Sequence, residues 1–248
     1  VKIDPKTGTL IRDGVPSIIN HDDKTGIEAA LQLKEQLGGT VTVVSMGPPQ
    51  ADVALREALA MGCDDAYLVS AREFGGSDTY ATSGIIAAAL KHIGYDLIIT
   101  GRQAIDGDTA QVGPQIAEKL HLPQVSYVEE VVEAAADHVV VKRQFEDGYH
   151  IIKIKTPCLL TAIAELATPR YMSVRGIVEA YEKEIKVLGF EDLKDGLELD
   201  MIGLKGSPTN VYQSFTKEVK GAGTILEGLS ADEAVKAIMD KLEAKFII

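Results

Sequence analysis

The chain has 248 residues, of which 46% are hydrophobic and 25% charged, and its formal net charge is −12. This length allows one large α/β domain, or one domain with an extension, around a sizeable core. The acidic balance and the absence of Trp argue against nucleic acid or an anionic membrane as the main partner, because both favour basic surfaces and nucleic acid also needs stacking platforms. No apolar run is long enough to span a bilayer, so we expect a soluble protein.

The two cysteines, Cys63 and Cys158, are far apart in the sequence and lie next to apolar residues. Each is expected to be a small core residue and not a ligand or nucleophile. The five histidines have no metal-ligand spacing with one another or with cysteine. We therefore expect no structural metal and a reducing, cytoplasmic compartment. The sequence begins at Val1 with no signal-peptide pattern, as expected of a chain that lacks a few amino-terminal residues.

The first half of the chain alternates strand and helix patterns after a short hairpin. Residues 1–15 alternate polar and apolar positions, with turns at Asp4-Pro5 and Thr7-Gly8, and predict a β-hairpin. Apolar periodicity then predicts helices over 27–37, 50–62 and 79–93, and strands over 41–45, 66–69 and 96–100. This alternation predicts a Rossmann-like, doubly wound, mainly parallel sheet with helices on both faces.

After Pro123 the pattern changes to that of antiparallel hairpins, with strands over 125–133, 137–145 and 149–155 and a further strand over 158–163. A loop follows over 167–176 and then a short polar segment that includes Glu179. Beyond about Leu188 we expect an extended arm with no core of its own, and then an amphipathic helix over 231–246 with a capping box at its start. The expected organisation is a domain over 1–187 and an arm plus helix over 188–248 that packs on its own domain or on another subunit.

The stretch from Gly101 to Glu118, GRQAIDGDTAQVGPQIAE, follows a buried strand and leads into a helix. An open α/β sheet binds its ligand at the carboxyl ends of its strands. The loop lacks the phosphate-binding lysine pattern and the G-x-G-x-x-G spacing, and a calcium loop fails because Ala110 and Ala117 stand at ligand positions. A nucleotide would be held there by backbone amides, the helix amino end and side-chain amides or hydroxyls. A surface loop capped by Asp and Thr is the alternative.

Several motifs occur together and in order: SIINHDDKTGIEAALQLKE, VSMGPPQ, ALAMGCDDAYLV, GRQAIDGDTAQVGPQIAEKLHLPQV and TPRYMSV. This set resembles the small (β) subunit of electron-transfer flavoproteins from the hairpin to about Val187, and GLKGSPTNVYQSFTKEVKG extends the resemblance into the arm. The family usually opens with one more strand and a Lys-Gln-Val-Pro-Asp-like loop, whose contacts are not assigned here. The resemblance implies a heterodimer with an FAD-bearing α subunit, on which residues 188–248 would pack.

The resemblance also implies a nucleotide site. Asn20 and Asp22 would fix the adenosine, 106–112 would present amides to the phosphates, and Thr79 and Thr82 would face the ribityl or flavin end. No residue is expected to act as acid, base or nucleophile. The full implied set consists of Asn20, Asp22, Ser45, Met46, Gly47, Thr79, Thr82, Gly101, Arg102, Gln103, Asp106, Gly107, Asp108, Thr109, Ala110, Gln111, Val112 and Gly113.

Members of the family hold either AMP or a second FAD in this subunit. AMP-type members resemble GKQAIDDD followed by Cys-Asn-Gln-Thr, whereas GRQAIDGDTAQVG resembles members that bind FAD and bifurcate electrons from NADH. The resemblance therefore implies that one electron reaches ferredoxin or flavodoxin and the other reaches an acyl-CoA dehydrogenase-type partner through the α-subunit FAD. The alternatives are an AMP-binding, non-bifurcating β subunit and, without the resemblance, a non-redox adenine-nucleotide sensor. An adenylate-forming enzyme is disfavoured because an SGGxDS-type loop is absent.

TPRYMSVRGIV resembles the loop by which the family docks on dehydrogenases. The implied partner-binding residues are Pro169, Arg170, Tyr171, Met172 and Val174. Val174 takes the place of the usual leucine anchor, and the lysines that follow in mammalian-type members are replaced by Glu179 and its neighbours. A plain surface loop is the alternative interpretation.

Overall fold

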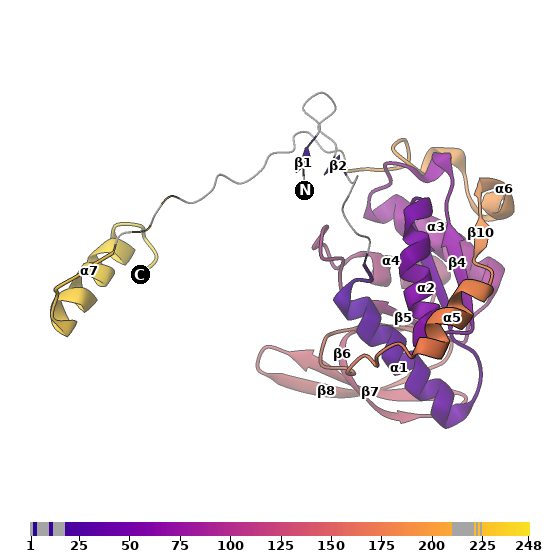
Figure 1. Ribbon diagram of the computed structural model, residues 1–248, viewed down its shortest axis with the longest axis horizontal. Helices are drawn as coiled ribbons and strands as arrows, with labels where there is room; N and C mark the ends of the chain where they lie inside the picture. The colour runs from indigo at the N-terminus through magenta and orange to yellow at the C-terminus, as the bar shows by residue number, and fades with distance from the viewer. Residues whose placement is uncertain (1, 4–9, 12–17, 210–220, 222, 224) are drawn as a thin grey trace. The chain divides into compact units, whose positions relative to one another are not determined.

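The computed structural model (Figure 1) describes residues 2–3, 10–11, 18–209, 221, 223 and 225–248. They fall into two units, which we describe separately: Asp13–Val211, and Val1–Arg12 together with Tyr212–Ile248. In the second unit, β1 (Lys2–Ile3) pairs antiparallel with β2 (Leu10–Ile11). This pairing confirms the predicted hairpin, while its turns at Asp4-Pro5 and Thr7-Gly8 lie outside the described residues.

The large unit is a doubly wound α/β domain. One parallel sheet has the order β10-β4-β3, and a second has the order β5-β9-β6-β7-β8, in which only the β6-β7 and β7-β8 pairs are antiparallel. The strands are β3 (Thr42–Met46), β4 (Asp65–Val69), β5 (Leu97–Gly101), β6 (Gln124–Ala134), β7 (His138–Phe145), β8 (Gly148–Lys155), β9 (Cys158–Ala162) and β10 (Lys186–Leu188). The predicted mainly parallel sheet with a hairpin extension is confirmed.

Helices cover both faces of these sheets (Figure 1). On one face lie α1 (His21–Leu37), α2 (Asp52–Met61) and α5 (Val174–Glu182), and on the other α3 (Thr79–Ile93), α4 (Val112–Leu120) and α6 (Phe190–Leu193). Val44 of β3 packs against the α3–α6 cluster and also against the α3–α4 cluster over β5. The helix α3 therefore packs over both sheets and joins their cores.

Two parts of the large unit differ from the sequence-based expectation. The polar segment after the 167–176 loop is the helix α5, whose first turn is capped by the Ser173 hydroxyl, which accepts the Gly176 N–H at 2.9 Å. The segment after Val187 is not a free arm, because Leu188, Leu193 and Ile202 are buried in the core beside α3. Their irregular spacing fits neither a helix nor a strand period, so no sequence pattern marked them. The compact unit consequently extends past the expected boundary, to Val211.

The carboxyl-terminal helix α7 (Ala231–Glu243) begins with the predicted capping box. The Ser230 N–H donates to the Glu233 carboxylate at 2.9 Å, and the Ser230 hydroxyl accepts the Glu233 N–H at 3.4 Å. One side of this helix exposes Val235, Ile238 and Met239. Residues 210–220 of the arm lie outside the described residues. Where the structure describes helices, none combines the length and apolarity that crossing a membrane requires.

Candidate functional site

The predicted nucleotide loop starts where β5 ends. Gly101 is paired with Ala162 of the parallel strand β9, and the Arg102 N–H donates to the Ala162 carbonyl at 2.8 Å. Residues 102–111 then leave the sheet from the carboxyl end of β5 and return as the helix α4. The segment 45–47 lies in the corresponding position at the end of β3, although the Met46 side chain packs against the core. Ser45, Met46 and Gly47 are all partly exposed, so the main chain and the Ser45 hydroxyl are the polar groups that this segment offers.

The amino end of α1 is hydrogen-bonded directly to this loop. The Asp23 carboxylate accepts the Gly101 N–H at 2.6 Å, and the Asn20 amide donates to the Gln103 carbonyl at 2.9 Å and to Asp23 at 2.8 Å. A Cβ atom on Gly101 would lie 2.8 Å from the Asp23 nitrogen, so only glycine allows this approach. Burial raises the pKa of Asp23, and the hydrogen bonds from Gly101 and Asn20 only partly oppose that rise. Asp23 was missing from the predicted set, although the Asn-His-Asp-Asp run that contains it was recognised.

Arg102 lies between a carboxylate and an aromatic ring. Its Nε is 3.6 Å from the Asp22 carboxylate, and its guanidinium carbon is 5.8 Å from the centre of the Tyr127 ring. The Arg102 Nε is buried and has no hydrogen-bond partner among the residues that the structure describes. A buried N–H of this kind is expected to meet an acceptor, and an oxygen of a bound nucleotide is one.

Tyr127 is a site residue that the sequence did not reveal. It has a φ of 59° at a register shift in β6, and its N–H donates to the buried Thr161 hydroxyl at 3.1 Å. A β-bulge redirects a side chain, and a non-glycine residue with positive φ often marks a functional site. Because β6 runs parallel to β9, the bulge places the Tyr127 ring at the carboxyl ends of the strands, beside Arg102.

The amino ends of α3 and α4 meet at the far side of the loop. The Thr79 hydroxyl donates to the Gln111 side-chain carbonyl at 2.8 Å, and Thr82 lies one turn further along α3. Gly113 allows α4 to approach the sheet, because a Cβ there would lie 2.7 Å from the Thr100 hydroxyl oxygen. At the start of α3 the Asp78 carboxylate accepts the Tyr80 and Ala81 N–H groups, both at 3.0 Å, whereas the start of α4 has no side-chain cap. The amino end of α4 is therefore the candidate anion site.

The tip of the loop is open. Residues 104–109 are exposed, and both Asp108 and Ala110 have the left-handed backbone conformation, with φ of 51° and 53°. Gln103 donates to Asp108 across the loop. A Cβ atom on Gly107 would meet no protein atom within 4 Å. The loop therefore offers main-chain amides together with the Asp106, Asp108 and Thr109 side chains, a set that fits the phosphates and hydroxyls of a nucleotide.

The predicted docking loop projects apolar side chains from the surface. Tyr171 is 99% exposed and Val174 is 81% exposed, while Met172 is partly exposed. Arg170 behaves differently, since its guanidinium is turned back to Glu28 and Glu35 of α1 at 2.7 and 2.6 Å. Pro169 precedes it at intermediate exposure. The structure thus separates Arg170 from the residues of the loop that are available to a partner.

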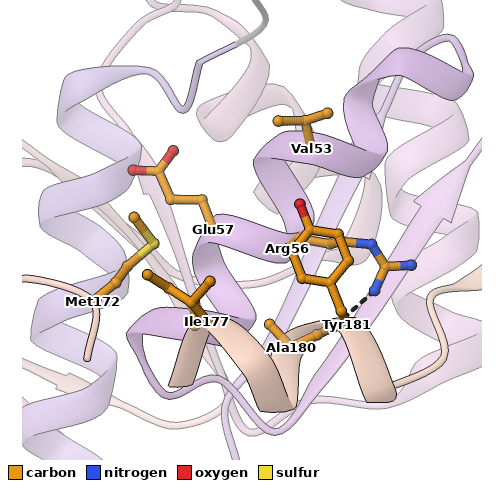
Figure 2. Close-up of a pocket in the computed structure, with 8 residues that line it drawn as sticks. Val53, Arg56, Glu57, Met172, Ile177, Ala180 and Tyr181 are labelled. Atoms are coloured by element: carbon orange, nitrogen blue, oxygen red, sulfur yellow. Dashed lines mark hydrogen bonds between the residues drawn. The ribbon is translucent and has the colours of Figure 1, made fainter. Parts of the chain in front are cut away.

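A cavity of about 220 Å³ lies between α2 and α5, next to this loop (Figure 2). Its polar groups are already paired: Arg56 donates to the Ala180 carbonyl at 2.7 Å, and Glu57 pairs with Lys24 at 2.5 Å. Met172 of the docking loop contributes to its wall, and the lining is Val53, Arg56, Glu57, Ala60, Met172, Ile177, Ala180 and Tyr181. None of these residues belongs to the 101–113 loop, so the cavity lies beside the predicted docking loop.

Both cysteines are core residues, as predicted. Cys63 and Cys158 are fully buried and unbonded to each other. Burial raises the pKa of each thiol to about 11, which keeps both in the unreactive protonated form at neutral pH.

The fold defines a class, that of Rossmann-like α/β proteins, in which ligands bind at the carboxyl ends of the strands. Comparison with known proteins narrows this class. The model of the electron transfer flavoprotein domain matches residues 7–193. The chain is 54% identical, over 100% of its length and 94% of the relative, to the electron transfer flavoprotein subunit beta of Thermoanaerobacterium thermosaccharolyticum.

Two further relatives have names that describe larger assemblies. The caffeyl-CoA reductase-Etf complex subunit CarD of Acetobacterium woodii is 52% identical over 100% of this chain and 94% of its own. The acryloyl-CoA reductase electron transfer subunit gamma of Anaerotignum propionicum is 55% identical over 97% of this chain and 92% of its own. The chain belongs to the electron-transfer flavoprotein family and is a β subunit. This assignment decides against the nucleotide-sensor and adenylate-forming alternatives.

Proposed function

We propose that this β subunit binds FAD at the 101–113 loop and passes electrons from NADH to two acceptors. One is ferredoxin or flavodoxin, and the other is an acyl-CoA dehydrogenase-type flavoenzyme reached through the FAD of the α subunit. When bound, FAD supplies the hydride acceptance and one-electron transfer that this division requires. The observation that carries the proposal is the loop itself, hydrogen-bonded to α1 by Asn20 and Asp23 and open at its tip.

In this proposal the chain's own residues bind and orient the nucleotide. The N–H groups at the start of α4 and the Arg102 guanidinium would hold the pyrophosphate. Asn20 and Asp22 hold the adenosine end, and Thr79 and Thr82 line the ribityl end. The Ser45–Gly47 segment contributes main chain and the Ser45 hydroxyl. No proton transfer by a side chain is needed.

The choice of FAD over AMP is supported by Gly107. No protein atom lies within 4 Å of the position that a Cβ would take on this residue, so packing within the described chain does not require glycine. A glycine that the protein itself does not need is explained when the main chain must approach a bulky ligand. The main chain at Gly107 would be open to the pyrophosphate of FAD, whereas AMP has a single phosphate and no second half to place there.

The proposed acceptors follow from the relatives. One relative is named as a subunit of a caffeyl-CoA reductase-Etf complex and another as an acryloyl-CoA reductase electron transfer subunit. Both names describe electron transfer linked to a reductase of an unsaturated acyl-CoA, which is the chemistry of an acyl-CoA dehydrogenase-type flavoenzyme run in the reducing direction. We place the complex in the cytoplasm, consistent with two free, buried thiols.

The decisive experiment identifies the nucleotides of the purified αβ complex. The proposal expects two FAD molecules per heterodimer after denaturation, and NADH-dependent reduction of ferredoxin when an acyl-CoA acceptor is present. One FAD and one AMP, with no ferredoxin reduction, would identify a non-bifurcating β subunit instead. Two FAD molecules without ferredoxin reduction would support FAD as the cofactor of this subunit and refute electron bifurcation.

We further propose that the exposed side chains of residues 171–174 dock on the dehydrogenase, with Val174 as the anchor. The substitution Val174→Asp places a charge in that contact and is expected to raise the KM for a short-chain acyl-CoA dehydrogenase at least tenfold, a cost of about 1.4 kcal/mol. Flavin content should not change. Val132→Asp is the control, because Val132 is 50% exposed on β6, outside this loop. Equal effects of the two substitutions would refute the docking role.

A further inference from the structure

Arg170 is held by a carboxylate that is almost completely buried. Its Nε donates to Glu28 Oε2 at 2.7 Å and its Nη2 to Glu28 Oε1 at 3.0 Å, while the Arg170 backbone N–H donates to Glu28 Oε2 at 3.1 Å. Only 5% of the Glu28 side chain is exposed. Two parallel charge-assisted bonds and one main-chain bond fix both the direction of the side chain and the position of the backbone.

Glu28 is itself fixed on α1. The Gln32 side chain donates to Glu28 Oε1 at 3.0 Å, one helical turn away. Burial acts to raise the pKa of Glu28, but the hydrogen bonds from Arg170 and Gln32 outweigh it, and the pKa is lowered. The carboxylate is therefore charged at neutral pH and available as an acceptor for the loop. Glu35, by contrast, has a side chain that is 60% exposed, and it accepts a hydrogen bond only from the Arg170 Nη1.

The residues next to Arg170 do little to hold the loop by burial. Tyr171 is 99% exposed, and Val174 at the start of α5 is 81% exposed. A segment with so little buried apolar surface is expected to be mobile unless polar contacts restrain it. Between the end of β9 and the first turn of α5, the contacts from Glu28 provide such a restraint.

The same helix also holds the nucleotide loop. At its amino end, Asp23 accepts the Gly101 N–H at 2.6 Å, and Glu28 follows five positions later along α1. An α-helix rises by about 1.5 Å per residue, so the two loops are attached to one rigid element about 7.5 Å apart along its axis. The distance between a bound nucleotide and the docking surface is then set by α1.

We propose that Glu28 is a positioning residue that fixes the conformation of the docking loop through its bonds to Arg170. In this proposal Arg170 does not itself contact the partner. We call the Glu28–Arg170 pair the Glu28 clamp. The inference rests on the proposed docking role of residues 171–174. It predicts that losing the clamp weakens docking without changing the nucleotide site, because a loosened loop must be ordered again when the partner binds.

The test uses the full αβ complex with a short-chain acyl-CoA dehydrogenase as the partner. Glu28→Gln keeps the side-chain shape and removes the charge, and Glu35→Gln is the matched control on the same helix. For Glu28→Gln we expect the KM for the dehydrogenase to rise about three- to tenfold, the cost of ordering one or two loop side chains. Turnover at saturating dehydrogenase and flavin content should stay unchanged. Glu35→Gln should change the KM less than twofold, because exposed ion pairs contribute little.

A purely structural role would lower thermal stability and leave the KM unchanged, and this result would overturn the inference.

The double variant Glu28→Gln/Val174→Asp separates the two proposals. If the clamp acts through the loop, Glu28→Gln should raise the KM by a smaller factor in the Val174→Asp variant than in the unmodified protein. If Val174→Asp has no effect, the docking role has failed. If Val174→Asp acts and Glu28→Gln does not, the clamp inference alone has failed. Faster hydrogen exchange at residues 167–173 in Glu28→Gln, and not in Glu35→Gln, is the second expected signature.

Discussion

The predicted nucleotide loop and the predicted docking loop are both held by α1, but they expose different surfaces. The tip of the first loop is mainly polar, with Ile105 77% exposed among its polar groups, and the second loop exposes apolar side chains. Around Gly101 the main chain is fixed by Asn20 and Asp23, and the exposed tip at 104–109 offers amides and carboxylates. The docking loop is fixed by Glu28 through Arg170, and its exposed groups are Tyr171 and Val174.

This difference shows how one helix can serve two kinds of recognition. The amino end of α1 lies at the strand ends and carries Asp22 and Asp23 in its first turn, so it presents polar side chains there. Glu28 lies further along the helix, where a charged group can be buried only if it is paired, and its partner Arg170 lies in the docking loop. In each case a carboxylate of α1 accepts a main-chain N–H of the loop, Asp23 from Gly101 and Glu28 from Arg170.

The largest effect is expected when a side chain is added at Gly101, where the loop packs directly against α1. In Gly101→Ala the added Cβ would lie 2.8 Å from the Asp23 nitrogen and 2.9 Å from its carboxyl carbon. Backbone atoms cannot move aside, so we expect a loss of about 1–3 kcal/mol in the free energy of unfolding and loss of nucleotide from the purified complex. Urea unfolding and nucleotide analysis measure the two effects.

Gly107→Ala is the matched control, since no protein atom lies within 4 Å of its Cβ position. We expect unchanged stability of the nucleotide-free protein and weaker FAD binding. Equal destabilisation of the nucleotide-free protein by Gly107→Ala and Gly101→Ala would show that the loop is packed as tightly at Gly107 as at Gly101, which contradicts the proposed difference.

An intermediate effect is expected from protonating Glu28. Its pKa in the folded protein lies below the ordinary value of about 4.5, so the clamp stabilises the fold above that pH, and the contribution is lost as the pH falls through the folded-state value. At pH 7 we expect Glu28→Gln to unfold with about 1–3 kcal/mol less free energy than the unmodified protein. This difference should shrink below about pH 4.5 as Glu28 protonates. A difference that is constant from pH 7 to pH 3 would contradict the assignment.

The smallest effect is expected at Tyr127. Removing the ring in Tyr127→Ala takes away the contact with Arg102, which is worth about 0.5–1 kcal/mol at a partly exposed site. FAD dissociation should become about two- to fivefold faster. Tyr127→Phe keeps the ring and should dissociate FAD at the original rate. Stopped-flow flavin fluorescence distinguishes the variants, and equal rates in Tyr127→Ala and Tyr127→Phe would remove Tyr127 from the site.

The sequence by itself determined the fold class and the family, and it predicted where a nucleotide would bind. Helix α1 and strand β5 follow from local apolar periodicity, and the loop after Gly101 follows from its place between a strand and a helix. Such features depend on residues close together in the chain, so a local pattern records them. The ordered motifs added the family, which the comparisons confirm.

The tertiary structure decided the features that join distant residues. Arg170 and Glu28 are 142 positions apart, and Arg102 meets Tyr127 only because β6 carries a bulge beside β9. The burial of Ile202 beside α3 likewise follows no period in the sequence. A periodic pattern shows which face of an element is buried but not which residue of another element it meets. The sequence therefore predicted a nucleotide loop and a docking loop, and only the tertiary structure showed that α1 contacts both.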